Sequence, residues 1–306
     1  MNNIVKTALI LIGAGAIMIL GAMVMAGFDF SRFNSMDFRP VSYELNDSFQ
    51  NIVVDATECD VRLVYAPGPC RVETLDSQWI QTQVEILTQA GTGQSTLQIT
   101  RKNTTPWWRS FGIWWNNWPS DLAITVYLPE NWYDTVDIHT VSGDVDIPAE
   151  FAFNRVAAKV TSGNISMLGW ASDSMGLETV SGHIVAAGAA GSVSAKTTSG
   201  RIELRDVTAD VLTVQTVSGS VTLEQVTVSE RARVDTTSGR IRLEDFDAGT
   251  MDIKTVSGSV TGTLLSPKNF QCKTVSGEVS VALQDPDAGL CKVETTSGNI
   301  HLEPAN

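Results

Sequence analysis

Nine Ser-Gly pairs are the residues of this 306-residue chain whose type and spacing first suggest chemistry. A serine hydroxyl can act as a nucleophile when a neighbouring base activates it, but no base accompanies the serine in every copy. Successive pairs are separated by 18 to 21 residues. The pairs therefore indicate a repeated structural corner rather than a catalytic site. Their glycines are Gly143, Gly163, Gly182, Gly200, Gly219, Gly239, Gly258, Gly277 and Gly298.

Other catalytic and metal-binding patterns are absent from the sequence. His139, His183 and His301 fall at outward positions of different repeats, and we interpret them as surface residues. No Cys/His spacing typical of a metal site occurs, nor a glycine-rich turn typical of calcium-binding repeats, so Asp144 and Asp146 are interpreted as solvated. The position after each corner glycine carries no column of paired acids such as glycoside hydrolysis requires. We expect a protein without enzymatic activity, metal or cofactor.

The corner itself is expected to be architectural. Glycine can adopt the positive φ that a turn requires, and serine can hydrogen-bond the local backbone. A threonine lies three residues before the glycine in eight of the nine repeats, with Val160 as the exception. Strand parity directs these threonines towards the corner or the interior, which disfavours a flat ice-binding face.

Short β-strands are the elements that position these corners. Val or Ile lies two residues after every corner glycine, and apolar residues lie seven and five residues before it, as in Leu212 and Val214. Polar residues such as Thr213 and Gln215 lie between, so the pattern has the period of two typical of strands with one buried face. One repeat cannot bury its apolar face alone, so the repeats must stack, each strand pairing in parallel with its counterpart one repeat later. The sequence predicts an all-β parallel solenoid of about nine regular coils.

A predicted membrane anchor precedes these strands. Residues 7–28 carry no charge and would span about 33 Å as a helix, which is enough to cross a bilayer. A cleaved signal peptide with an imperfect site at residues 24–26 is the alternative. We favour an uncleaved transmembrane anchor at residues 1–28 followed by a stalk at 29–48. The prediction is a single-pass protein of the cell membrane that contacts the lipid bilayer through residues 7–28 and has its C-terminal domain outside.

Strands without the Ser-Gly corner are expected from residue 49 onward. Residues 49–135 are predicted to form atypical first coils or a cap over the open end of the stack, and 136–306 the repeats. The expected strands of the first region are 51–55, 60–65, 70–75, 79–87, 97–101 and 122–128. No comparable cap follows His301 and Leu302, so we expect an exposed edge there that could self-associate.

A tryptophan-rich segment, residues 106–119, interrupts the cap. Its aromatic residues are spaced as on one face of a short helix, and Arg109 is its only charge. Three interpretations stay open: a lid over the open end of the solenoid, a membrane contact at headgroup depth, or an aromatic platform for a glycan. The candidate membrane or ligand contacts are Trp107, Phe111, Trp114, Trp115 and Trp118.

Charge and cysteine content exclude two classes of protein. A net charge of −13 without a basic stripe argues against binding to nucleic acid. Four cysteines are too few and too scattered for a disulfide-built scaffold. Cys272 should lie opposite Val293 and Cys291 opposite Phe270, so these two thiols would be diagonal, buried and free. Cys59 and Cys70 flank a turn and could pair only if the chain doubles back closely.

The repeat pattern also suggests a family. The repeated T-V/T-S-G-x-V/I-x-L pattern, preceded by a strand that ends at Leu128-Pro129, resembles the bacterial putative-adhesin family of β-strand-repeat proteins over residues 49–306. The resemblance implies an envelope-exposed, right-handed β-solenoid, often membrane-anchored, without known catalytic residues. We therefore expect a non-catalytic surface protein that binds a surface polymer or an envelope protein through its outer columns. The alternative is a membrane-associated accessory protein in envelope stress response or signalling.

Overall fold

The computed structural model describes residues 37–91, 93–104, 121–281 and 284–305, together with Gly15, Met18 and Gly21. The residues from Arg39 onward, apart from Thr105–Ser120, form one compact unit. Among the described residues, no helix is both long and apolar enough to cross a membrane. The anchor predicted at 7–28 and the segment 106–119 lie outside the described residues, apart from the three isolated positions named above.

Seven strands precede the repeats, which begin with β8 (Trp132–Ser142). β2 and β3 form a first coil that pairs in parallel with β8 and β9 of the repeats. β6 and β7 pair in parallel with the other side of this coil, and β5, β4 and β1 follow in antiparallel pairing. Residues 39–45, predicted as stalk, instead form a strand paired along its length with β4. The seven strands are β1 (Arg39–Leu45), β2 (Asn51–Glu58), β3 (Asp60–Tyr65), β4 (Cys70–Asp76), β5 (Ile80–Thr88), β6 (Ser95–Asn103) and β7 (Ala123–Leu128).

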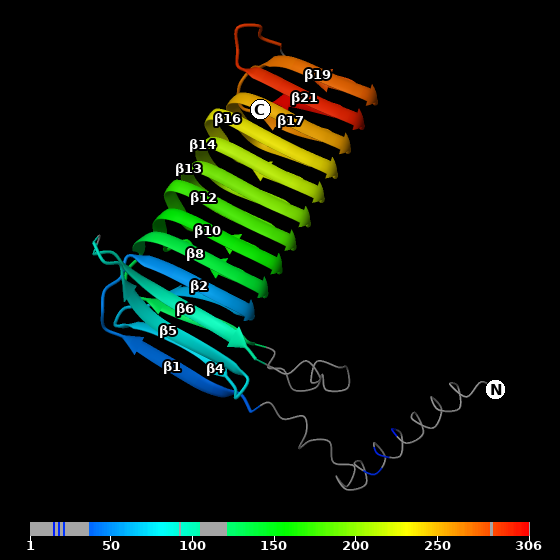
Figure 1. The fold of residues 1–306 in the computed structure, drawn as a ribbon. Coiled ribbons are helices and arrows are strands. Elements are labelled where there is room, and N and C mark those ends of the chain that lie inside the picture. The colour runs from blue at the N-terminus through cyan, green and yellow to red at the C-terminus, as the bar shows by residue number, and fades with distance from the viewer. Residues whose placement is uncertain are drawn as a thin grey trace, which may run out of the picture. The chain divides into compact units, whose positions relative to one another are not determined.

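The remaining strands stack as a parallel β-solenoid, as predicted (Figure 1). The stack has about eight turns, whereas about nine coils were predicted. The difference arises because nine corners delimit only eight corner-to-corner turns. Its strands are β8 (Trp132–Ser142), β9 (Val145–Ile147), β10 (Ala152–Ser162), β11 (Ile165–Met167), β12 (Trp170–Ser181), β13 (Ile184–Ser199), β14 (Ile202–Ser218), β15 (Val221–Glu224), β16 (Thr227–Ser238), β17 (Ile241–Ser257), β18 (Val260–Leu264), β19 (Asn269–Ser276), β20 (Val279–Val281), β21 (Leu290–Ser297) and β22 (Ile300–Pro304).

The period-two pattern fixes which side chains form the core. Leu212, Val214, Val221 and Leu223 are fully buried, and the polar residues between them face outward. Equivalent positions of every coil join one continuous apolar cluster that also includes the cap. Because each coil covers the apolar face of its neighbour, no coil is stable alone.

The last two coils stack in an order that differs from their order in the sequence (Figure 1). β21 pairs with both β17 and β19, and β22 pairs with both β18 and β20. The coil β21/β22 is therefore inserted between its two predecessors. The predicted pairing with the next repeat is therefore wrong for Met251–Ser257 of β17 and for β18, which pair with β21 and β22 two repeats later, and holds for β19 with β21 and β20 with β22. The exposed edge predicted after Leu302 is also wrong, because β22 is an inner strand and β19/β20 form the end of the stack.

Candidate functional site

The predicted aromatic site lies outside the described residues. The segment that contains Trp107, Phe111, Trp114, Trp115 and Trp118 joins β6 to β7, which belong to one coil. In sequence order, the segment therefore stands between two strands of one coil, where each repeat has a Ser-Gly pair. At its start, the backbone N–H and Oγ1 of Thr104 both donate to the carbonyl oxygen of Trp79, each at 2.8 Å.

The nine corner glycines form a column that allows close stacking. The N–H of Gly219 donates to the carbonyl oxygen of Ser238 at 3.0 Å, and every other corner glycine except Gly277, at the end of the stack, repeats this bond to the neighbouring coil. A Cβ at Gly219 would overlap the carbonyl group of Gly200, so close approach, more than a positive φ, selects glycine here. The threonines three residues earlier point inward, as predicted, and all are buried except Thr274 of the end coil, which is partly buried; Oγ1 of Thr179, for example, donates to a glycine carbonyl at 3.0 Å.

The corner serines have a different role from the one predicted. All nine are exposed, and no hydroxyl among them forms a hydrogen bond with any described residue. The residues after the glycines satisfy the backbone instead. Oδ1 of Asp144 accepts a bond from the N–H of Asn164 at 2.7 Å, Oδ1 of Asn164 accepts from His183 at 2.9 Å, and Nδ1 of His183 accepts from Arg201 at 2.9 Å. Asp144 is exposed, as predicted, and in addition stabilises the corner through this bond.

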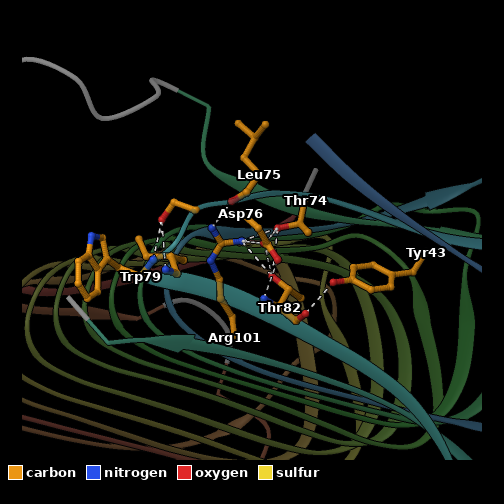
Figure 2. Close-up of polar contacts among 9 residues, drawn as sticks. Tyr43, Thr74, Leu75, Asp76, Trp79, Thr82 and Arg101 are labelled. Atoms are coloured by element: carbon orange, nitrogen blue, oxygen red, sulfur yellow. Dashed lines mark hydrogen bonds and ion pairs between the residues drawn. The ribbon is translucent and has the colours of Figure 1, made fainter. Parts of the chain in front are cut away.

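A buried arginine joins the strands of the cap (Figure 2). Arg101 of β6 donates to Oγ1 of Thr74 and, at 2.6 Å, to the carbonyl oxygen of Leu75, both in β4. Asp76 lies 3.8 Å away and accepts bonds from the N–H and Oγ1 of Thr82 in β5, at 2.9 and 2.8 Å. The guanidinium charge is therefore compensated inside the cap. The cluster ties β4, β5 and β6 together and is structural.

A shallow groove of about 770 Å³ runs across the longer strands of the repeats, from β12 to β19. Buried threonines form its floor, and two rows of outward side chains form its walls. We call the surface formed by the outward residues of β8, β10, β12, β13, β14, β16, β17, β21 and β19 the groove face.

The charge row is one wall of the groove. Its members lie four residues before each corner glycine, and opposite charges alternate along most of it. In spatial order they are His139, Lys159, Glu178, Lys196, Gln215, Asp235, Lys254, Glu294 and Lys273. In sequence order Lys254 and Lys273 would be neighbours. The inserted coil places Glu294 between them.

The valine-threonine row is the other wall. Its members lie two residues before each glycine, and they alternate without exception only in the spatial order. That order is Val141, Thr161, Val180, Thr198, Val217, Thr237, Val256, Thr296 and Val275. The five valines are 50 to 76% exposed. Exposed apolar rows of this kind are common at surfaces that contact another molecule.

Two exposed tryptophans were missed by the sequence interpretation. Trp132 and Trp170 are 54% and 58% exposed and each pairs with Ala152 of the coil between them. The ring of Trp170 also approaches Gly188 of the next coil. The two tryptophans are 38 residues, or two repeats, apart in the sequence, and this spacing could have identified them as equivalent positions.

All four cysteines are free thiols. The predicted register is confirmed, since Cys272 pairs with Val293 and Cys291 with Phe270. Burial raises the pKa of Cys59, Cys70 and Cys272 to about 11 and that of Cys291 to about 12, so the thiols are protonated and unreactive near neutral pH. Cys272 is only partly buried because its coil ends the stack. Among the described residues, no cluster of His, Cys, Asp or Glu could hold a metal ion.

Solved structures with similar architecture come from several bacteria. A putative adhesin from Bacteroides fragilis is 13% identical, with a TM-score of 0.48, over 88% of this chain and 99% of that chain. A putative lipid binding protein from Parabacteroides distasonis is 17% identical, with a TM-score of 0.49, over 87% and 97%. A putative adhesin from the same species is 14% identical, with a TM-score of 0.49, over 87% and 98%.

The family assignment rests on the sequence match. No curated protein matches the chain. The family model described as Toastrack DUF4097 matches residues 49–191 and 173–305, which include the first coil, the cap and every repeat. This match confirms the resemblance to the putative-adhesin family seen in the repeats. The chain therefore belongs to the Toastrack DUF4097 family.

Proposed function

We propose that the protein is a non-catalytic, membrane-anchored binding protein that displays its solenoid outside the membrane. The groove face is the observation that carries this proposal. It offers a row of half-exposed valines beside a row of charges, over the full length of the repeats. Exposed apolar rows rimmed by polar residues are typical of surfaces that bind a macromolecule.

The charges of the groove face are arranged for contact rather than for acid–base chemistry. Several of its carboxylates lie within ion-pair distance of a cation on the same strand, as Asp235 does with Arg233 at 2.6 Å and Asp252 with Lys254 at 3.0 Å. These carboxylates are therefore already engaged by a neighbouring cation of their own strand.

Fractionation of cells that express the full chain tests the anchor. We expect the protein in the membrane fraction, resistant to carbonate extraction, with the solenoid cleaved by protease added outside intact cells. Deletion of residues 7–28 should release it from the membrane, because the bilayer contact is assigned to that segment. A deletion variant that stays in the membrane, or a solenoid protected from external protease, would contradict the proposal.

Binding is tested with the full chain in detergent micelles, with purified cell-wall polysaccharide as the probe. Self-association of the full chain is measured under the same conditions. Lys196→Glu on the groove face is the variant, and Arg240→Glu at an exposed corner is the matched control, since both change the charge by the same amount. We expect Lys196→Glu to weaken whichever contact is found and Arg240→Glu to leave it unchanged. Binding that requires another envelope protein would favour the accessory role instead.

A further inference from the structure

We propose that the groove face binds the groove face of a second copy of this chain, with the two solenoids antiparallel. The two-fold axis runs parallel to the strands and lies over the coil that contains Gln215 and Val217. This inference names the partner of the binding face and so rests on the proposed function, although its argument uses only described residues. An isologous contact of this kind requires a surface that is complementary to itself.

The charge row has this property. Counted outward from Gln215, the residues on its two sides carry opposite charges at the first three steps. A two-fold axis at Gln215 therefore sets three charges of one copy against charges of opposite sign in the other. The facing pairs are Lys196 with Asp235, Glu178 with Lys254 and Lys159 with Glu294. Opposite charges that face each other favour association and fix its register.

The two halves of the charge row also differ in what surrounds them. Lys159, Glu178 and Lys196 form no ion pair with any described residue. Their partners across the axis already lie beside a charge of opposite sign, as Glu294 does with Lys292 at 3.0 Å. The dimer would place each unpaired charge against such a pair and leave none of the three alone.

The valine-threonine row obeys the same symmetry. Val217 lies on the axis, so it faces itself, Val180 faces Val256, and Val141 faces Val275. The threonines face threonines, as Thr198 does Thr237. Half-exposed valines of the two copies would thus cover one another, and burial of apolar surface is the main favourable term in association.

A third row, six residues before each corner glycine, is complementary in size. The three residues next to Thr213 on one side are small, and the three on the other side are charged. Across the axis, each small residue faces a larger one. The facing pairs are Ser194 with Arg233, Gly176 with Asp252 and Ala157 with Lys292. The long side chains therefore extend over the places where the partner leaves room.

Other arrangements of two copies lose this match. A two-fold axis along the stack would set the charge row of one copy against the valine-threonine row of the other. A shift of the proposed axis by half a coil would place lysine against lysine, because Lys196 would then face Lys254. At the end of the face, Lys273 faces His139, whose Nε2 lies 2.9 Å from Asp137.

The area of the face fits a stable dimer. Three outward rows occupy about 20 Å along the strands, and nine strands at about 4.8 Å occupy about 43 Å, which gives roughly 850 Å² for each copy. A standard protein interface buries about 800 Å² on each partner. The groove face is therefore large enough without a contribution from any other surface.

Sedimentation equilibrium of the full chain in detergent micelles tests the pairing of charges. Lys196→Glu and Asp235→Lys should each weaken dimerisation about tenfold, because each converts two attractive contacts into repulsive ones. The double variant should restore it, since the two charges are exchanged. Arg240→Glu should have no effect. A monomer at all accessible concentrations, or a double variant weaker than both single ones, would overturn the proposal.

Thiol crosslinking tests the register independently. In a Cys272→Ser background, Val217→Cys should crosslink to itself with a short bis-maleimide, because it lies on the axis. Val180→Cys alone should not, whereas a mixture of Val180→Cys and Val256→Cys should. Crosslinking of every variant with itself would show parallel copies and reject the antiparallel dimer. Binding of cell-wall polysaccharide by the monomer, without these crosslinks, would assign the face to a polymer instead.

Discussion

At the scale of single residues, the corner column shows why one residue type recurs. A Cβ on Gly219 would overlap the carbonyl group of Gly200, and one on Gly239 would overlap that of Gly219. The neighbouring serines are exposed and their hydroxyl groups form no hydrogen bond with a described residue. Glycine is therefore required for the stack to close at strand spacing, whereas serine is not.

Substitution of Gly219 by alanine tests this requirement. We expect the free energy of unfolding to fall by about 3 kcal/mol, because the backbone of two coils must separate to accept the methyl group. Ser218→Ala is the matched control and should change it by less than about 0.5 kcal/mol. Urea-induced unfolding followed by circular dichroism measures both. Equal effects of the two substitutions would show that the overlap at the corner is relieved without cost.

At the scale of elements, the inserted coil changes which side chains are neighbours. The connection from β18 to β19 is attached to β17 through Lys268, whose Nζ donates to the carbonyl oxygen of Ala248 at 2.7 Å and lies 2.6 Å from Asp247. β21 then occupies the space between β17 and β19. The result separates Lys254 from Lys273 by Glu294, which removes a repulsion that sequential stacking would create.

Disulfide formation between neighbouring strands tests the inserted coil. The variant Lys254→Cys/Glu294→Cys should form an intramolecular disulfide, because paired residues of adjacent strands lie about 4.8 Å apart and within disulfide reach. Lys254→Cys/Lys273→Cys should not, since two strand spacings, about 9.6 Å, exceed that reach. Oxidation followed by mass spectrometry of tryptic peptides distinguishes them. The reverse result would show that the coils stack in sequence order.

At the scale of the whole molecule, the four thiols affect stability at high pH. Burial raises the pKa of each above the ordinary value of 9.0, to about 11 for Cys59, Cys70 and Cys272. The unfolded chain therefore loses these protons first as the pH rises. The contribution to stability is complete below about pH 9 and is lost between pH 9 and the folded pKa.

The free energy of unfolding should accordingly fall as the pH rises from about 9 to 11. A variant with Cys59, Cys70, Cys272 and Cys291 replaced by alanine should show a smaller fall over this interval, whatever its stability at pH 7. Urea-induced unfolding at intervals of half a pH unit measures the dependence of both proteins. The same slope for both would show that other groups cause it.

The sequence determines the repeated part of the fold more fully than its ends. Period-two alternation and the glycine spacing predicted the parallel solenoid, its buried threonines and the pairing of Cys272 with Val293. The inserted coil could not be read from spacing, because any two coils present the same apolar edge. The alternation of Thr296 and Val275 with Val256, and of Glu294 with Lys254 and Lys273, was the signal available for it. The cluster around Arg101 was equally hidden, since its partners come from β4 and β5 and share no local pattern.

The inserted last coil also limits how such a protein can grow. A solenoid is lengthened by tandem duplication, since each coil contacts only its neighbours. A copy added after β22 would begin inside the stack, because β22 already pairs with β18 on one edge and with β20 on the other. New coils must therefore arise upstream of β17. They must also arise in pairs, because a single extra coil would break the alternation of valine with threonine along the groove face.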